Sequence, residues 1–447
     1  MTGMTLDATA RRGHALRAAV EQDLLTPDNP VIGLLDVTAI HETAAALRTA
    51  FATPGVTVTH TFAVKAAALV PVLRLLAGLG LGAEVASPGE LSLARAAGLP
   101  ADRIVLDSPA KTVAELREAL ALGIAVNADN PGELRRLDAL RAASPSTSSL
   151  GLRVNPQVGG GSIGAMSTAT ATSKFGVALR DDGAEEWIAA AYADRPWLDR
   201  LHTHTGSQGV PLDLMAAGVR AAYDLAERVN AAAGRRQITT LDIGGGLPVN
   251  FASDEVTPTF DDCARLLRAR VPGLFDGRYT VVTEFGRSLL AKAGTVLARV
   301  EYAKTAGGRP IAITHAGAQL ATRTVFAPDA WPLRVAALDA TGRPKGGDPV
   351  VQDVAGPCCF AGDLVARARP LPLLAEGDLV ALLDTGAYYF STHFAYNSLP
   401  RPAIHGYAAS PDGSVRFALV RAAQTVEELL AESGAEESEA LMGLGRS

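Results

Sequence analysis

The chain has 447 residues, and its 41 basic and 47 acidic side chains give a formal net charge of −6. Nucleic acids and anionic membranes bind basic surfaces, so this acidic balance argues against both as main partners. Hydrophobic residues make up 48% of the chain and charged residues 20%, which excludes global disorder. The length fits two or three ordinary domains, or one barrel of about 250 residues with a smaller companion.

The cysteine content and the N-terminal segment indicate where the protein works. Three cysteines, two of them adjacent (Cys358 and Cys359), cannot form a disulfide framework. The N-terminal segment is charged rather than apolar, unlike a signal peptide. The most apolar stretch, residues 66–86, is interrupted by Pro71, Arg74 and three glycines, so it is not a membrane span. We therefore expect a soluble cytoplasmic protein.

Strand-like and helical segments alternate over the first two thirds of the chain. Helix ends are identifiable between the strands; for example, Thr112 and Glu115 form a capping box, and Gly123 ends that helix. Repeated strand–helix units with continuously apolar strands indicate a parallel sheet that is buried on both faces. Eight such units fit a closed (β/α)8 barrel better than an open sheet. The predicted strands are residues 56–66, 82–87, 103–109, 125–130, 150–156, 200–207, 240–246 and 279–287.

After about residue 290 the pattern changes to strands separated by turns, and long helices become scarce. The predicted strands of this region are residues 295–302, 310–314, 333–338, 379–383 and 415–420. We therefore predict an α/β fold with two domains. A (β/α)8 TIM-type barrel spans residues 31–287, and a mostly-β domain combines residues 1–30 with 288–447. The acidic tail, residues 427–439, is expected to form a solvated end.

Catalytic residues of such barrels lie at the C-terminal ends of the strands. Lys65 ends the first predicted strand, where a desolvated lysine has a lowered pKa and can form a Schiff base; a rim lysine without catalytic role is the alternative. Gly244 to Gly246 follow the seventh strand, and their N–H groups are suited to a phosphate, although a tight turn explains them equally well. Glu284 ends the eighth strand as a buried acid, with Arg287 close by for the same phosphate.

His202 and His204 are two residues apart on the sixth predicted strand, so both side chains point to one face. A structural histidine pair is one interpretation. A zinc pair is the other, because this spacing also occurs in metal-dependent hydrolases. A zinc site needs further ligands at other strand ends, whereas His315, His393 and His405 fall in the second domain. The metal-hydrolase interpretation is therefore disfavoured.

Nine short motifs follow one another along the chain. They are Phe-Ala-Val-Lys-Ala (62–66), Glu-Val-Ala-Ser-Pro-Gly-Glu-Leu (84–91), Arg-Val-Asn-Pro (153–156), Ser-Lys-Phe-Gly (173–176), His-Thr-His-Thr-Gly-Ser-Gln (202–208), Asp-Ile-Gly-Gly-Gly (242–246), Glu-Phe-Gly-Arg (284–287), Gly-Pro-Cys-Cys-Phe-Ala-Gly-Asp (356–363) and Asp-Thr-Gly-Ala-Tyr (384–388). With these motifs in this order, the chain resembles the fold-type III pyridoxal-phosphate decarboxylases, the family of diaminopimelate and ornithine decarboxylases. The barrel of that family is similar to that of alanine racemase. The likeness extends from about Val31 to Pro402.

The resemblance implies a role for individual residues. Lys65 matches the lysine that binds pyridoxal 5'-phosphate covalently, His204 the histidine stacked on the pyridine ring, and Glu284 the acid paired with the ring nitrogen. Cys359 matches a cysteine that enters the site from the other subunit, which implies a homodimer with shared active sites. The implied cofactor site consists of Lys65, Glu84, His204, Ser207, Gly244, Gly245, Gly246, Glu284, Arg287 and Tyr388.

The residue at position 284 separates decarboxylase from racemase chemistry. Loss of CO2 leaves negative charge at Cα, and a protonated pyridine ring is the electron sink that stabilises it. The Glu284 carboxylate favours the protonated nitrogen, whereas an arginine, as racemases of this fold carry, disfavours it. A thiol such as Cys359 is suited to return the proton. We therefore expect an amino-acid α-decarboxylase rather than a racemase or epimerase.

A catalytically silent homologue that regulates a partner is the binding-module alternative, and Lys65 together with Cys359 argues against it. The other two cysteines are expected to be structural. Cys358 is interpreted as a packed neighbour of Cys359, and Cys263 as a buried helix residue.

Two departures from the family pattern concern the substrate. Phe360 stands where diaminopimelate decarboxylases carry a glutamate for the distal ammonium, and Ala327 replaces a tyrosine expected four residues after Arg323. Burying an unpaired ammonium against phenylalanine is costly. We therefore expect an amino acid with a carboxylate-bearing distal end, such as a citryl-diaminopropionate-like siderophore precursor. Diaminopimelate decarboxylase proper, which makes lysine, is the alternative.

The expected substrate residues are Arg287, Arg323, Phe360 and Tyr388. The run Cys-Phe-Ala-Gly-Asp (359–363) is similar to that of carboxynorspermidine and siderophore-type decarboxylases. Ornithine and arginine are less expected, because no acidic residue other than Asp363 is placed to meet a distal cation. Residues 159–172, rich in glycine, serine and threonine, are expected to form a lid.

Overall fold

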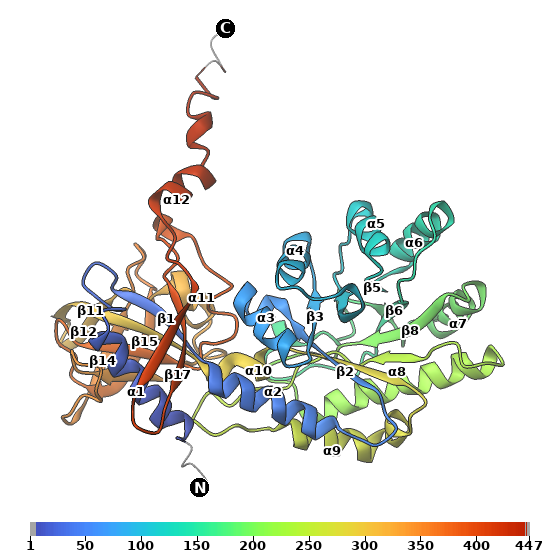
Figure 1. Cartoon of the computed structure of the whole chain (residues 1–447), viewed down its shortest axis with the longest axis horizontal. Coiled ribbons are helices and arrows are strands. Elements are labelled where there is room, and N and C mark those ends of the chain that lie inside the picture. Colours follow the sequence, from blue (N-terminus) through green and yellow to red (C-terminus); the bar gives the residue numbers. More distant parts are fainter. Residues whose placement is uncertain (1–5, 443, 445–447) are drawn as a thin grey trace. The chain divides into compact units, whose positions relative to one another are not determined.

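The structure, a computed structural model, describes residues 6–442 and 444. The described chain divides into two compact units, each built around its own sheet (Figure 1). One unit spans Ile40–Lys292. The other combines the described residues up to Ala39 with those from Ala293 onward. These limits differ from the predicted barrel limits of 31 and 287.

Eight parallel strands form a closed barrel in the unit Ile40–Lys292. Each strand pairs with the next along the chain, and β10 pairs back with β2. The predicted (β/α)8 barrel is confirmed, because each expected segment contains one barrel strand. A two-residue strand, β7 (Val177–Ala178), pairs with β6 beside the ring. The barrel strands are β2 (Val58–Ala63), β3 (Gly82–Val85), β4 (Ile104–Leu106), β5 (Ala125–Ala128), β6 (Leu150–Asn155), β8 (Leu198–Thr203), β9 (Thr240–Asp242) and β10 (Thr280–Phe285).

Helices α3 to α9 surround the barrel strands (Figure 1). The predicted capping box is present at α5, where Thr112 and Glu115 bond each other's backbone N–H groups and Gly123 ends the helix at φ 76°. The helices of this unit are α2 (Val37–Phe51, which starts before its limit), α3 (Val70–Gly78), α4 (Pro88–Ala96), α5 (Val113–Leu122), α6 (Pro131–Ala143), α7 (Ala184–Asp194), α8 (Leu212–Ala232), α9 (Phe260–Arg270) and α10 (Arg287–Leu290).

A second sheet forms the core of the other unit. Its central strand β11 pairs antiparallel with β1, β12 and β16. The strands are β1 (Val31–Asp36), β11 (Gly294–Ala306), β12 (Arg309–Thr314), β13 (Val335–Leu338), β14 (Pro349–Ala355), β15 (Leu364–Pro372), β16 (Leu379–Leu383), β17 (Ile404–Ala409) and β18 (Val415–Arg421). The expectation of a mostly-β domain is confirmed. Strands β1, β14, β15 and β17 escaped prediction; in β14 and β15, prolines and arginines obscure the strand pattern.

Strand β1, which was not among the predicted strands, lies in this sheet, although its residues fall inside the predicted barrel range of 31–287. It pairs antiparallel with β11 and parallel with β17 (Figure 1). A continuously apolar strand looks the same in sequence whether it is central in a mixed sheet or in a barrel. At its end, Asp36 accepts a hydrogen bond from the Ala39 N–H (3.0 Å) and a buried one from Arg11 Nε (2.7 Å). The Asp36 carboxylate therefore caps α2, the helix that leads into the barrel.

The remaining helices of this unit are α1 (Ala8–Glu21), α11 (Ala318–Phe326) and α12 (Val426–Glu432). Helix α12 begins with a capping box of Thr425 and Glu428 and buries none of its side chains. This agrees with the solvated end expected for the acidic tail. Within the described part of the chain, no helix has both the length and the apolar composition that crossing a membrane requires.

Candidate active site

Lys65 lies just past the end of β2, in a single 3-10 turn (Val64–Ala66), rather than on the strand itself. Its Nζ is 2.5 Å from Oε2 of Glu84, the last residue but one of the neighbouring strand β3. The Lys65 side chain is 49% exposed and that of Glu84 only 2%. The amine is therefore less desolvated than the sequence analysis expects. A buried carboxylate orients it at the C-terminal end of the barrel.

Glu284 lies on β10, at the same end of the barrel, and is buried. One carboxylate oxygen, Oε2, is 3.5 Å from Nε2 of His202. The other, Oε1, is buried and has no hydrogen-bond partner among the described residues. Burial, reinforced by the nearby Asp242 carboxylate, raises the pKa of Glu284 well above its usual range. A buried acceptor of this kind is costly unless a donor from outside the chain meets it.

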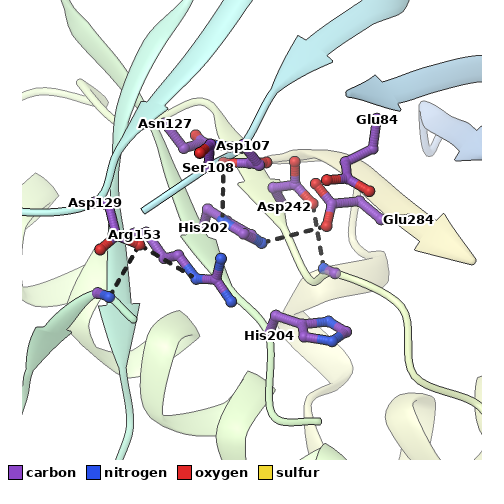
Figure 2. A network of polar contacts seen from close by, with 12 residues as sticks. Glu84, Asp107, Ser108, Asn127, Asp129, Arg153, His202, His204, Asp242 and Glu284 are labelled. Carbon is purple, nitrogen blue, oxygen red and sulfur yellow. Dashed lines mark hydrogen bonds and ion pairs between the residues drawn. The ribbon is translucent and has the colours of Figure 1, made fainter. Parts of the chain in front are cut away.

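His202 lies between two carboxylates inside the barrel (Figure 2). Its Nδ1 is 3.5 Å from Oδ1 of Asp107, which follows β4, and its Nε2 faces Glu284. Although burial lowers the pKa of His202, the carboxylates of Asp107, Glu284 and Asp242 raise it to about 10. His202 is therefore an imidazolium near neutral pH. Burial opposes ionisation of Asp107, but the His202 charge lowers the pKa of that carboxyl well below its usual range.

A chain of buried hydrogen bonds orients Asp107 from behind. Asn127 on β5 donates to Asp107 Oδ2 (3.0 Å) and accepts from Arg200 Nε (3.2 Å). Arg200 on β8 pairs with Asp242 on β9 (2.9 Å). Asp242 in turn accepts a hydrogen bond from the Gly244 N–H (3.2 Å). Side chains on β5, β8 and β9 and the residue after β4 are thus connected into one polar network. Figure 2 shows Asp107, Asn127 and Asp242 of this network.

His204 lies just beyond β8 and differs from His202 in its charge. Its Nδ1 accepts a hydrogen bond from the Gly245 N–H (3.1 Å), so the ring is neutral with its proton on Nε2. Burial, aided by the positive charges of Arg153 and Lys65, lowers the pKa of His204 well below its usual range. A flat neutral ring at this position is suited to stack on an aromatic cofactor.

The glycine turn after β9 is required by the close approach of its neighbours. A Cβ on Gly245 would lie 2.2 Å from the carbonyl oxygen of Glu284, and one on Gly246 would lie 1.8 Å from that of Gly206. Gly246 also has a φ of 101°, which strains other residues. The alternative weighed from the sequence, a tight turn that needs glycine, therefore applies. Arg287, predicted for the same phosphate, is buried at the start of α10.

The expected lid, residues 159–172, packs on the loop that follows β8. The Ser162 N–H donates to the Gly209 carbonyl (2.9 Å), and the Thr168 N–H donates to the Thr205 carbonyl (3.1 Å). Ser207, a predicted phosphate ligand, donates its own N–H to Met166 (3.0 Å). The structure thus describes this segment docked on the loop that carries His204 and Ser207.

The other unit carries the remaining predicted residues. The Arg323 guanidinium lies over the Tyr388 ring at 4.6 Å and over the Trp331 ring at 5.1 Å. Its Nη1 is buried without a hydrogen-bond partner in the described part of the chain. Tyr388 has a φ of 67°, an uncommon conformation for a tyrosine. A planar cation stacked on aromatic rings, with a donor unused, is suited to bind a carboxylate.

Cys359 is exposed, and residues 396–397 bind both its backbone N–H and its backbone carbonyl. Its N–H donates to Asn397 Oδ1 (2.8 Å), and its carbonyl accepts from the Tyr396 hydroxyl (3.4 Å). The next residue, Phe360, stacks on Phe326 with ring centroids 5.5 Å apart and meets Tyr396 edge-on at 5.3 Å. Position 360 therefore belongs to an aromatic cluster, whereas an ammonium site would need a carboxylate.

Asp363, the one acidic residue that the sequence analysis considered for a distal cation, is not available to it. It is buried, and its two oxygens accept from the N–H groups of Ala318 (2.6 Å) and Cys358 (2.7 Å). Cys358 is buried as expected, and burial together with Asp363 raises the pKa of its thiol to about 11. Cys263 is likewise buried, on α9, and burial raises its thiol pKa to about 12. Both are structural residues, as predicted.

The zinc interpretation of the two histidines is not supported by their orientation. His204 Nδ1 is engaged by a backbone N–H, so the histidines do not form a ligand pair. Asp107, His202 and Glu284 lie close enough together for a metal.

Comparison with known proteins establishes the family. The model of the pyridoxal-binding domain of the pyridoxal-dependent decarboxylases matches residues 37–291. Diaminopimelate decarboxylase of Pseudomonas aeruginosa is 36% identical over 372 residues, which cover 83% of this chain and 85% of the relative. The chain therefore belongs to the pyridoxal-dependent decarboxylases, as the motifs predict. It is a carboxy-lyase that acts on an amino acid with pyridoxal 5'-phosphate as cofactor.

Solved structures agree with this assignment. A variant of Helicobacter pylori diaminopimelate decarboxylase in complex with L-lysine has a TM-score of 0.80 and 25% identity, covering 93% of this chain and 100% of that one. Lysine/ornithine decarboxylase of Vibrio vulnificus in complex with cadaverine has a TM-score of 0.72 and 26% identity, covering 88% and 97%.

The barrel residues fit the cofactor of this family. The buried Oε1 of Glu284, without a donor among the described residues, suits the N–H of a protonated pyridine ring. The neutral His204 suits the ring face, and the half-exposed Lys65 amine suits the aldehyde. Sequence reasoning missed Asp107, Asn127 and Asp242. Each of them lies at the end of an apolar strand, the signal that had drawn attention to Glu284.

Proposed function

We propose that the protein removes the α-carboxyl group of an amino acid whose distal end carries a second carboxylate. Diaminopimelate is the member of this class that the named relatives support best, and it has more support than a siderophore precursor. The buried Nη1 of Arg323, which has no hydrogen-bond partner among the described residues, carries the proposal, since the resemblance assigns Arg323 to the substrate. The acidic-appendage alternative rests on Phe360, whose aromatic surroundings offer no acid to an ammonium.

Each barrel residue has a role in this proposal. Lys65 binds the cofactor, with Glu84 orienting its amine, and His204 covers the ring face. When bound, pyridoxal phosphate supplies an electron-poor ring that stabilises the negative charge left at Cα by loss of CO2. Glu284 accepts from the ring N–H and keeps that nitrogen protonated. The cofactor phosphate is assigned to Ser207, to the turn of Gly244, Gly245 and Gly246, to Arg287 and to Tyr388.

In the proposed enzyme, the active unit is a homodimer with shared sites. The Cys359 thiol of one copy returns the proton to Cα in the site of the other. Its exposure supports this role, because a proton donor must be accessible to the substrate. A cytoplasmic setting is part of the proposal, since a free, exposed thiol stays reduced there.

A CO2-release screen tests the substrate class. The panel contains diaminopimelate, lysine, ornithine, arginine and an amino acid with an acidic appendage. We expect turnover of the substrates with a distal carboxylate and at least about a hundredfold lower kcat/KM for the others, because an unpaired buried charge costs about 3 kcal/mol. Arg323→Gln should remove this preference, mainly through KM. Faster turnover of lysine or ornithine would contradict the proposed substrate class.

Mixing two inactive variants tests the shared site. Lys65→Ala and Cys359→Ala should each be nearly inactive alone. Random exchange of subunits makes half of the dimers mixed, and each mixed dimer contains one intact site, so about a quarter of the wild-type activity should return. Activity that stays at the level of the separate variants, with exchange confirmed by mass spectrometry, would show that each subunit completes its own site.

A further inference from the structure

The position of His202 suggests a function beyond packing. Its ring spans the interior between Asp107, after β4, and Glu284, on β10, with both nitrogens 3.5 Å from a carboxylate oxygen (Figure 2). The side chain is 1% exposed, so water does not compensate either carboxylate. An imidazolium is the one state of the ring that donates to both sides at once.

The contacts divide the two oxygens of Glu284 between different tasks. Oε2 faces His202, whereas Oε1 has no partner among the described residues. The ion-pair contact of Oε2 with the His202 ring, at 3.5 Å, favours one orientation of the carboxylate. In that orientation Oε1 is the oxygen left for the proposed contact with the ring nitrogen of the cofactor.

Asp107 is itself rigidly positioned. Its Oδ2 accepts from Asn127, which is bonded through Arg200 to Asp242. The charged groups that face His202 are then Asp107, Glu284 and Asp242, with the neutral His204 beyond it on the same segment. Arg200 already pairs with Asp242, which leaves the single charge of His202 to serve both Asp107 and Glu284.

We propose that His202 is a positioning residue, which as an imidazolium beside Asp107 orients the Glu284 carboxyl group toward the ring nitrogen of the bound cofactor and favours its ionised form there. This inference rests on the role proposed for Glu284. A neutral residue at position 202 leaves Glu284 buried beside Asp107 and Asp242 without a cation. The protonated form of Glu284 is then favoured further, which weakens its support for a protonated ring nitrogen.

The test measures the protonation of the cofactor in the loaded protein. The ring nitrogen of pyridoxal phosphate is isotope-labelled, and its protonation is followed by nitrogen NMR against pH. In the wild type it should stay protonated across neutral pH. In His202→Leu its titration midpoint should fall by at least about one unit, with about a tenfold or larger loss of kcat and little change in KM. His202→Gln, which keeps a donor toward Glu284, should lie between the two.

Three further variants, Asp107→Asn, His60→Gln and Glu284→Gln, serve as controls for this test. Asp107→Asn should shift the ring titration in the same direction as His202→Leu, and it replaces that variant if the leucine protein does not fold. His60→Gln is the matched control. His60 is a buried barrel histidine whose Nδ1 lies 2.8 Å from Oγ1 of Thr283, and it does not contact Asp107 or Glu284 in the way that His202 does. Its ring titration should equal that of the wild type.

Glu284→Gln separates failure of this inference from failure of the proposed function. A shift in Glu284→Gln without one in His202→Leu or Asp107→Asn would overturn the positioning role and leave the role of Glu284 intact. An unshifted ring nitrogen in Glu284→Gln would overturn the proposed role of Glu284 itself.

Discussion

Replacing Lys65 by alanine is expected to lower kcat by at least about a thousandfold, because alanine carries no amine that could bind the cofactor covalently. Lys65 is the lysine paired with Glu84 at the barrel end, and the buried carboxylate orients Nζ (2.5 Å). Pyridoxal phosphate should still associate through the remaining contacts, so the loss falls on kcat. Borohydride reduction followed by peptide mass spectrometry should find the label on Lys65 in the wild type and no labelled lysine in the variant.

Two controls complete this experiment. Lys304→Ala removes an exposed lysine of β11 and should leave both label and activity unchanged. Lys65→Arg keeps the charge beside Glu84 but cannot form the imine, so it should be as inactive as the alanine variant. A label on another lysine, or substantial CO2 release by either variant at position 65, would contradict the role assigned to Lys65.

The strand ends of the barrel could be predicted from the sequence, and with them Lys65 and Glu284. Apolar runs identify the strands, and the barrel rule places their C-terminal residues at one end. The contact of His202 with Asp107 and Glu284 could not be predicted in this way. It joins β4, β8 and β10, and which side chains meet across a barrel interior depends on register and strand tilt, which the local pattern does not encode.

The residues of the second unit show a similar limit. Arg323 stacks on Tyr388, which is 65 positions away in the chain and has a left-handed backbone conformation. No local sequence pattern predicts this stacking. Asp363 illustrates the opposite error, since an acidic residue that could have met a substrate cation caps two backbone N–H groups instead. Residues 31–36 fell inside the predicted barrel range because an apolar run does not show which of the two sheets it joins.

The second large effect is expected on the stability of the barrel, at the buried ion pair of Lys111 and Glu133. Lys111 is fully buried in the loop between β4 and α5, and its Nζ lies 2.7 Å from Oε1 of Glu133 and 2.7 Å from the carbonyl of Ser108. Lys111→Met leaves the Glu133 carboxylate buried without its cation. We expect the free energy of unfolding of the barrel to fall by about 3–5 kcal/mol, measured by denaturant unfolding monitored on the apoprotein.

The pH dependence of this loss identifies its cause. Burial already raises the pKa of Glu133, and removing the cation of Lys111 raises it further. An acid with a raised pKa in the folded state binds its proton more tightly there than in the unfolded chain. Its cost in stability therefore grows as the pH rises from the unfolded-state pKa and is complete above the folded-state pKa. The deficit of Lys111→Met should therefore be smaller at about pH 5 than at about pH 8.

The double variant Lys111→Met/Glu133→Gln decides between loss of an ion pair and loss of packing. Glutamine keeps an acceptor for the Asp129 N–H, which Glu133 Oε2 binds at 3.3 Å. Without a buried charge on either side, the double variant should regain most of the lost stability, since replacing a whole buried pair is often close to neutral. The matched surface control, Lys304→Met, should change stability by less than about 0.5 kcal/mol. If Lys111→Met and the double variant are equally unstable at every pH, the buried charge of Glu133 is not the cause, and the contribution of Lys111 is packing and its bond to Ser108.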